Sequence, residues 1–450
     1  MSGEPMTDGV DIQAGRLSRA VLAENFADVH VPLDEAGALA EANRCYFCYE
    51  APCIAACPTG IDIPGFIRAI ATANLTGAAM TILKENIMGG SCARVCPTEI
   101  LCQGDCVRNG DGDRPLAIGL LQRHATDHLD RAAPHPFTRA PETGKSVAVV
   151  GAGPAGLACA HALARLGHGV TLFEGRAKPG GLNEYGIAAY KVPDDYAQEE
   201  TRFITAIGGI ETRYGQALGR DISLARLRNE FDAVFLGLGQ GGVRALEVPG
   251  AELAGVHNAV DYIAELRQAG DLAALPVGRR IVVIGGGNTA IDIAVQTKRL
   301  GADDVTIVYR RGPVQMGATR HEQEFAQTNG VRLKHWLRPV RLEGEGGVGR
   351  AVFQGVELGA DGALVDTGGE QAIACDMVFK AVGQAFVPLA DSGPDLAGGR
   401  ITVDETGRTS LPDVWAGGDC VAGADLTVQA IQDGKTAAGA IAAYLTNLGS

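Results

Sequence analysis

The sequence contains no long uninterrupted run of apolar residues and no excess of basic residues. A membrane-spanning helix needs about twenty consecutive apolar residues, so we do not expect the chain to cross a membrane. The 450 residues carry a formal net charge of −14, which argues against a protein that binds nucleic acid or an anionic membrane surface. The partners that remain are proteins and small molecules.

Several short signals are missing as well. The first residues lack the basic and apolar segments of a secretory signal, so we expect a protein of the reducing cytoplasm. The nine histidines show no metal-ligand spacing. The cysteines after Cys106 are Cys159, Cys375 and Cys420, and they are isolated. We therefore expect no closely spaced redox disulfide of the kind found in flavin disulfide reductases in that part of the chain.

The other eight of the eleven cysteines lie between Cys45 and Cys106. They follow the order Cys45-x2-Cys48-x4-Cys53-x3-Cys57-Pro58 and then Cys92-x3-Cys96-Pro97-x4-Cys102-x3-Cys106. Thiolates at such short gaps, with a proline directly after two of them, are typical of iron–sulfur ligands. This block predicts two [4Fe–4S] clusters.

Two other interpretations of the cysteine block are weaker. Disulfides need an oxidising compartment and are most common in small secreted domains. Structural zinc favours paired cysteine knuckles, and only Cys45 with Cys48 and some looser later pairs fit that pattern. Iron–sulfur clusters therefore remain the favoured interpretation.

The length predicts about two to four domains, because a single core stops growing well below this size. Residues 1–130 have helical periodicity around the cysteines and predict an α-helical domain that holds the two clusters. A polar, proline-rich stretch at 131–145 predicts a linker. From Ser146 onward, apolar strands alternate with glycine turns and helices, which indicates α/β domains with parallel sheets.

A strand, glycine loop, helix and second strand occur twice in this order. Glycines in such a loop permit a tight turn, and the following helix offers unpaired N–H groups to a pyrophosphate. Two Rossmann-like dinucleotide sites are therefore expected, although Ala290 stands where the second loop would have its third glycine. The predicted contacts are Gly151, Ala152, Gly153, Pro154, Ala155 and Gly156 in the first loop, and Gly285, Gly287, Asn288, Thr289 and Ala290 in the second.

The residues that end the second strand of each copy distinguish the two nucleotides. Glu174 ends this strand in the first copy, where a carboxylate can accept hydrogen bonds from an adenosine ribose, and this suits FAD. Arg310 and Arg311 occupy that place in the second copy and can bind a 2′-phosphate, which favours NADPH over NADH. A solvated arginine pair is the alternative, since arginine is common on surfaces. Arg320 is a further candidate.

A second FAD segment is predicted near the end of the chain. Gly418 and Asp419 follow an apolar strand, and Thr427 then opens the last helix. The Asp419 carboxylate suits a ribityl or phosphate-side hydroxyl, and the dipole of the helix suits the flavin pyrimidine edge. An ordinary turn is the alternative for Asp419. The FAD domain is thus expected in two parts, 146–255 and 386–450, with an NAD(P)-binding domain at 256–385 inserted between them.

These motifs resemble a known family over nearly the whole chain. The segments Gly285–Asp292, Tyr309–Arg311 and Ala416–Asp419, with the cysteine block, are similar to the small subunit of bacterial glutamate synthase and to the N-terminal half of dihydropyrimidine dehydrogenase. The stretch around Gln122 favours the flavin and NAD(P)-binding subunit of bacterial dihydropyrimidine dehydrogenase. In that family a glutamine at this place replaces a cysteine ligand, whereas glutamate synthase is expected to have glutamate there.

The resemblance implies an assignment of cluster ligands. It leaves Cys92 as a bystander, whereas counting alone would place four cysteines in each cluster. For Gln122, an ordinary exposed helix glutamine is the alternative. The implied ligands are Cys45, Cys48, Cys53 and Cys106 for cluster one, and Cys57, Cys96, Cys102 and Gln122 for cluster two.

The resemblance also implies further nucleotide contacts. Leu182, Lys191 and Ala217 would contact FAD, and Ala381 and Gly383 would contact NAD(P). Most relatives are expected to have arginine where Lys191 stands, and these two side chains are not interchangeable as hydrogen-bond donors.

The role implied by the resemblance is electron input. The chain would pass electrons from NAD(P)H through FAD and the clusters to an FMN-containing, dihydroorotate-dehydrogenase-like subunit that reduces uracil or thymine, in a hetero-oligomer. No catalytic residue beyond the cofactor-binding ones is expected. The alternatives are the small subunit of glutamate synthase and a stand-alone NAD(P)H:acceptor reductase.

Overall fold

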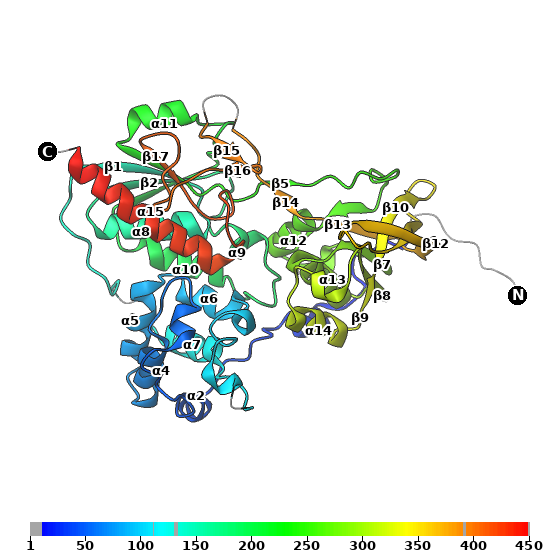
Figure 1. Cartoon of the computed structure of the whole chain (residues 1–450), viewed down its shortest axis with the longest axis horizontal. Helices are drawn as coiled ribbons and strands as arrows, with labels where there is room; N and C mark the ends of the chain where they lie inside the picture. The colour runs from blue at the N-terminus through cyan, green and yellow to red at the C-terminus, as the bar shows by residue number, and fades with distance from the viewer. Residues whose placement is uncertain (1–10, 111, 130–133, 390–392, 449–450) are drawn as a thin grey trace, which may run out of the picture. The chain divides into compact units, whose positions relative to one another are not determined.

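The computed structural model describes residues 11–110, 112–129, 134–389 and 393–448 (Figure 1). These residues form two compact units. One comprises the described parts of 29–184, 194–242 and 385–448, and the other comprises 11–28, 185–193 and 243–384. Among the described helices, none combines the length and the apolar character that a membrane crossing requires.

The first unit begins with short helices around the cysteines. Three of them begin after a capping Asp or Asn whose side chain accepts a hydrogen bond from the N–H of the glycine three residues later. In α4 (Ile63–Ala71), for example, Asp62 accepts this bond from Gly65 at 2.9 Å. A Cβ on Gly65 would lie 2.1 Å from the Asp62 carboxylate, so glycine allows this close cap. The helices are α2 (Glu35–Ala42), α3 (Pro52–Ala55), α4 (Ile63–Ala71), α5 (Leu75–Glu85), α6 (Gly89–Val95) and α7 (Ile118–Asp127), with 3-10 turns η1 (Thr98–Ile100) and η2 (Val107–Asn109).

A parallel sheet follows in the same unit, with strand order β17-β4-β1-β2-β3. Strand β17, from the end of the chain, pairs with β4, and residues 243–384, which belong to the second unit, lie between them in the sequence. The strands are β1 (Ser146–Val150), β2 (Gly169–Glu174), β3 (Ile210–Tyr214), β4 (Ala233–Leu236) and β17 (Val414–Ala416), and β15 (Leu396–Ala397) with β16 (Arg400–Ile401) forms a hairpin. The helices are α8 (Pro154–Arg165), α9 (Leu182–Tyr185), α10 (Tyr196–Thr205), α11 (Leu224–Glu230) and α15 (Thr427–Asn447).

Helices α8 and α15 lie against each other beside this sheet (Figure 1). Their close approach depends on Gly434, because a Cβ there would lie 2.1 Å from the carbonyl oxygen of Ala155. Val149, Leu157, Phe235 and Ile431 form the apolar core between sheet and helices. The starts of both helices are thereby held at the carboxyl ends of the strands, where ligands bind in such sheets.

The second unit contains another parallel sheet, with order β6-β13-β7-β8-β9. A three-stranded antiparallel sheet, β10-β11-β12, belongs to the same unit. Strands β5 (Gly242–Val243) and β14 (Gln384–Ala385) mark where the chain passes between the units. The other elements are α1 (Arg19–Asn25), β6 (Val256–Asn258), α12 (Ala259–Gln268), η3 (Leu272–Ala274), β7 (Arg280–Gly285), α13 (Asn288–Arg299), β8 (Asp304–Tyr309), η4 (Pro313–Gln315), α14 (Arg320–Thr328), β9 (Val331–His335), β10 (Leu337–Glu343), β11 (Arg350–Leu358), β12 (Leu364–Ala374) and β13 (Met377–Ala381).

The structure differs from the expected boundaries at two segments. Residues 11–28 and 185–193 belong to the second unit, rather than to the helical and FAD domains. Arg16 Nε donates to the Val277 carbonyl oxygen at 2.9 Å, and Asn25 Nδ2 donates to the Arg299 carbonyl oxygen at 2.8 Å. Of the expected linker, residues 131–133 lie outside the described residues, and 134–145 contain no helix or strand.

Candidate cofactor sites

The first group of cysteines lines one pocket. Cys45, Cys48, Cys53 and Cys106 face it together with apolar side chains such as Ile63 and Leu116. Burial raises the pKa of Cys53 to about 12, and the neighbouring Cys106, Cys45 and Cys48 add to this rise. Four thiols in one apolar pocket can ionise together only if positive charge is bound among them, so this donor set fits an iron–sulfur cluster.

A second group contains Cys57, Cys96 and Cys102. Burial raises the pKa of Cys102 to about 12, with Cys57 as the next cause. The pKa of Cys96 is raised by a hydrogen bond with the Cys92 thiol, then by burial, and further by Cys102 and Cys57. Cys92 therefore lies beside this group, and its sulfur accepts a hydrogen bond from Asn86 Nδ2 at 3.1 Å.

Neither group is arranged around a single ion. Within the described residues, no set of three or more His, Cys, Asp or Glu side chains is placed to hold one metal ion. A [4Fe–4S] cluster is bound through four irons, so its thiolate ligands stand farther apart than ligands of one ion.

Gln122 lies on α7 and is 7% exposed. Its Nε2 donates to the Gly89 carbonyl oxygen on α6 at 2.7 Å, which fixes the carboxamide. Its Oε1 accepts no hydrogen bond from the residues that the structure describes. Because Gln122 is buried, it is not the ordinary surface glutamine that was the alternative, and its role as a ligand stays a prediction.

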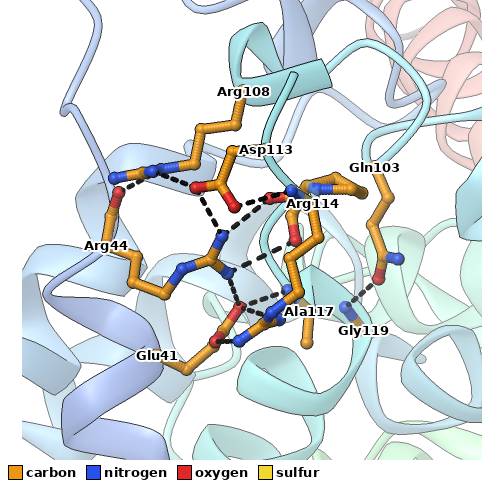
Figure 2. Close-up of polar contacts among 9 residues, drawn as sticks. Glu41, Arg44, Gln103, Arg108, Asp113, Arg114, Ala117 and Gly119 are labelled. Atoms are coloured by element: carbon orange, nitrogen blue, oxygen red, sulfur yellow. Dashed lines mark hydrogen bonds and ion pairs between the residues drawn. The ribbon is translucent and has the colours of Figure 1, made fainter. Parts of the chain in front are cut away.

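An ionic network holds the segment after Cys106 (Figure 2). The buried Glu41 carboxylate accepts hydrogen bonds from Arg44 at 2.7 Å, from Arg114 at 2.6 Å and from the Ala117 N–H at 2.8 Å. Burial opposes ionisation, but Arg114, the Ala117 N–H and Arg44 outweigh it and hold the pKa of Glu41 below its usual value. Arg108 donates to Asp113 in the same network, at 2.5 Å. These bonds tie α2 to the chain between Cys106 and α7.

The first dinucleotide loop leaves an open helix start. A Cβ on Gly151 would lie 2.2 Å from the Gly237 carbonyl oxygen, and one on Gly156 would lie 1.8 Å from the Gly151 carbonyl oxygen. These two glycines are therefore needed for the turn itself. Gly153 caps α8 without a side-chain hydrogen bond, and its own face has space, so the unpaired N–H groups of α8 can bind a phosphate.

Glu174 lies at the end of β2 beside this loop and is buried. Its carboxylate accepts hydrogen bonds from the Ala152 N–H at 3.0 Å and the Arg176 N–H at 2.8 Å. Each carboxylate oxygen has a further lone pair, so this geometry allows the predicted ribose contact. Ala217 lies close by, since a Cβ on Gly175 would be 3.1 Å from its Cβ.

The end of β17 and the start of α15 form the second part of this site. Gly418 donates its N–H to Asp433 at 2.9 Å, and Thr427 starts α15 with no side-chain cap. Burial, and then Asp425, raises the pKa of Asp419 to about 6. Thr427 Oγ1 also donates to Asn183 Oδ1 at 3.3 Å, which brings α9, where Leu182 lies, to α15. The donors and the half-buried carboxylate fit a flavin nucleotide.

The second dinucleotide loop repeats the arrangement of the first. A Cβ on Gly285 would lie 2.2 Å from the carbonyl oxygen of Ala381, whereas one on Gly287 would meet no atom within 4 Å. Gly287 caps α13, which begins at Asn288 and Thr289, without a side-chain hydrogen bond. Ala290 is fully buried in the third position. Gly383 lies near Arg244, whose N–H donates to its carbonyl oxygen at 3.1 Å.

Arg310 and Arg311 directly follow β8. Neither guanidinium forms an ion pair with a carboxylate in the described part of the chain, and Arg310 is exposed. Arg320 differs, because its Nε is 2.8 Å from Glu324 Oε1. The pair after β8 is therefore the better candidate for an added phosphate.

Two known protein families match most of the chain. Residues 145–434 match the family described as pyridine nucleotide-disulphide oxidoreductase. The chain belongs to this family. Residues 22–133 of this oxidoreductase match a second family, described as dihydropyrimidine dehydrogenase domain II, 4Fe-4S cluster. The protein is thus an NAD(P)H-dependent flavin iron–sulfur oxidoreductase, and the expected helical iron–sulfur domain and FAD and NAD(P) domains are confirmed.

Relatives of this oxidoreductase include two kinds of subunit. NAD-dependent dihydropyrimidine dehydrogenase subunit PreT of Escherichia coli (strain K12) is 36% identical over 410 residues, covering 91% of this chain and 94% of that protein. The glutamate synthase [NADPH] small chain of Halomonas elongata is 34% identical over 449 residues, covering 94% of each. The resemblance inferred from the motifs is confirmed.

Solved structures support the fold of the oxidoreductase. FprA from Mycobacterium tuberculosis in complex with NADPH aligns with a TM-score of 0.57 at 22% identity, covering 68% of this chain and 85% of that one. Lactococcus lactis thioredoxin reductase aligns with a TM-score of 0.53 at 22% identity, covering 67% and 99%.

Lys191 of the oxidoreductase lies in the segment 185–193, which belongs to the second unit. The FAD loop belongs to the first unit. Its Nζ is 2.9 Å from Asp292 Oδ1 and 2.6 Å from Glu322 Oε1. Burial would lower the pKa of Lys191, but these two carboxylates outweigh it and raise that pKa. The structure pairs Lys191 with α13 and α14, and its predicted flavin contact stays a prediction.

Sequence reasoning did not single out Glu41, Asn86 or Glu322. Each acts through a partner far from it in the sequence, or through a side-chain contact that no local motif encodes. For Asp292, a signal existed, because it closes the quoted motif Gly285–Asp292. The structure places Asp292 on α13, where its side chain is buried.

Proposed function

We propose that the chain is the electron-input subunit of a dihydropyrimidine dehydrogenase. The observation that carries this proposal is the second cysteine group with the buried, fixed carboxamide of Gln122 on the neighbouring helix. When bound, FAD accepts hydride from the nicotinamide, and iron–sulfur clusters carry electrons one at a time. The work of this chain is to bind these groups, orient them and tune them.

Two [4Fe–4S] clusters are proposed. Cluster one takes Cys45, Cys48, Cys53 and Cys106, a set supported by their shared pocket. Cluster two takes Cys57, Cys96 and Cys102 with Gln122, and Cys92 remains outside it. The proposed nucleotide contacts are the predicted residues of the two loops, with Glu174, Asp419 and Thr427 for FAD and with Arg310 and Arg311 for NADPH.

The core packing supports an order of electron transfer. Cys57 and Cys96 pack against the apolar core that includes Val428 and Ile431 of α15, beside the proposed flavin site. Cys45, Cys53 and Cys106 pack against the core of the helical domain, to which Cys57 and Cys102 also contribute. We place cluster two on the flavin side and cluster one on the exit side, where Tyr49 is fully exposed.

Replacement of Gln122 tests the ligand assignment. A thiolate in place of the neutral carboxamide adds one negative charge next to the cluster, and this should lower its reduction potential. In an EPR redox titration, we expect Gln122→Cys to lower the midpoint potential of one of two clusters. An unchanged or raised potential contradicts the assignment.

NADPH is the proposed coenzyme, because the arginine pair after β8 has no carboxylate partner within the described residues. The PreT relatives carry NAD in their names and the glutamate synthase small chains carry NADPH. We propose that this chain shares its role with the former and its coenzyme with the latter.

The catalytic partner is proposed to be an FMN-containing, dihydroorotate-dehydrogenase-like subunit in a cytoplasmic hetero-oligomer. The isolated chain should then reduce dyes with NAD(P)H but reduce uracil or thymine only with this partner. Purification of the untagged native complex, with mass spectrometry of its second polypeptide, tests this. A large amidotransferase chain would identify glutamate synthase instead, and a turnover-competent chain without any partner would identify a stand-alone reductase.

A further inference from the structure

Lys435 lies on α15, two turns after Thr427. Its ammonium group donates to the carbonyl oxygens of Glu85 and Thr59, the latter at 3.5 Å, and lies 3.3 Å from Glu85 Oε2. Glu85 ends α5, and Thr59 lies in the loop after Cys57. One side chain of the last helix thus binds two segments of the helical domain within the same compact unit.

Thr59 is 4% exposed and lies in a tight turn. The Gly60 N–H donates to the Cys57 carbonyl oxygen at 2.9 Å, and Gly60 has a φ of 69°, a conformation that glycine adopts readily. This turn directs the Thr59 side chain back, so that its Oγ1 lies 3.3 Å from Cys57 Sγ. A thiolate bound to iron has no proton, so the hydroxyl must be the donor once a cluster is present.

We propose that Thr59 and Lys435 form a bridge between cluster two and α15, the proposed flavin helix. This bridge sets the reduction potential of cluster two and fixes its position relative to α15. This inference rests on the proposed function, because it takes Cys57 as a ligand of cluster two and α15 as the flavin helix. Both are positioning residues, because they act through Cys57 and the turn that follows it.

The physical argument has two steps. A hydrogen bond to a ligand sulfur withdraws negative charge from the cluster and stabilises the reduced form, which raises the reduction potential. Lys435, which is paired with the Glu85 carboxylate and bound to the carbonyl of Thr59, fixes the turn against α15. Electron transfer between cofactors slows steeply with distance, so a loosened turn should slow the step between flavin and cluster.

Thr59→Val tests the hydrogen bond, since valine keeps the shape and loses the hydroxyl. In anaerobically purified full-length protein, we expect unchanged iron and sulfide content and a lower midpoint potential for one cluster by EPR titration. Thr59→Ser should restore the parent potential. Thr81→Val, which removes a hydroxyl bonded to the Gly77 carbonyl within α5, should leave both potentials unchanged. An unchanged potential in Thr59→Val overturns the proposal.

Lys435→Met provides a second, independent measurement. In stopped-flow reduction by NADPH, we expect flavin bleaching at the parent rate and slower appearance of the reduced-cluster EPR signal. Lys84→Met, at an exposed lysine on α5, is the matched control and should reduce its clusters at the parent rate. If the clusters are reduced at the same rate in Lys435→Met and in the parent, the proposed role of the bridge is overturned. Parent protein without clusters would instead contradict the proposed function, so the two failures are distinguishable.

Discussion

The arginine pair after β8 differs from its neighbour Arg320 in its surroundings. Arg320 is bound to Glu324, whereas Arg310 and Arg311 have no carboxylate partner among the described side chains. A hydrogen bond to a charged group contributes about 1.5–3 kcal/mol, and about 1.4 kcal/mol is a tenfold change. We expect the double variant Arg310→Ala, Arg311→Ala to lower kcat/KM for NADPH at least about tenfold while sparing NADH. Steady-state kinetics with both coenzymes measure this, with Arg320→Ala as control. An equal loss with NADH contradicts a 2′-phosphate site.

Asp419 offers a test of the flavin site by stability. Its folded-state pKa of about 6 is above the unfolded value of about 3.9, so the ionised carboxylate costs stability once the pH exceeds the unfolded value. This cost grows between about pH 4 and pH 6 and is complete above that range, on the order of 3 kcal/mol. We expect Asp419→Asn to raise the melting temperature of FAD-free protein at pH 7, with a difference that disappears near pH 4, and to weaken FAD binding. A variant that is less stable at pH 7 would contradict this account.

At the residue scale, the cysteine spacing predicted clusters but could not divide the ligands between them. The division into Cys45, Cys48, Cys53 and Cys106 came from the family resemblance, and the shared pocket supports it. The Lys191 contact could not be foreseen, because Glu322 lies 131 positions later in the sequence. Local patterns carry no information on such long-range pairing.

At the element scale, α8 and α15 must approach closely for both helix starts to reach one site. Gly434→Ala would place a Cβ 2.1 Å from the Ala155 carbonyl oxygen and force the helices apart. Overpacking of this kind costs about 1–3 kcal/mol. We expect urea denaturation to show this loss, with weaker FAD binding. Gly439→Ala in the same helix is the control, since nothing lies within 4 Å of its Cβ, and it should stabilise by about 0.5–1 kcal/mol. Equal effects of the two substitutions would exclude a special role for Gly434.

The two nucleotide-binding units were predictable because each carries its glycine loop, strands and helix within a short stretch of sequence. The antiparallel sheet β10-β11-β12 was not predicted. Its longest strand, β12, is exposed along most of its length and contains Gly368 and Gly369, so it lacks the apolar alternation of a typical strand. Pairing with β11 overrides that weak local preference.

At the scale of the whole molecule, the second sheet is inserted in the sequence between β4 and β17. The pairing of β17 with β4 then places the start of α15 beside the first glycine loop. The family match over residues 145–434 and the separate match over 22–133 confirm the succession of an iron–sulfur domain and a reductase. Sequence reasoning reached this level because each part carries its own motif. It could not place residues 11–28, whose contacts with Val277 and Arg299 are made by single side chains and one bridge.

The account depends most on the clusters in the helical domain. The direct measurement is quantification of iron, acid-labile sulfide and FAD in full-length protein purified without oxygen, followed by EPR after addition of NADPH. We predict about eight iron and about eight sulfide per FAD, as two [4Fe–4S] clusters require, and a reduced-cluster signal on NADPH addition. Protein that binds FAD but contains no sulfide, or whose clusters NADPH leaves oxidised, would contradict the account.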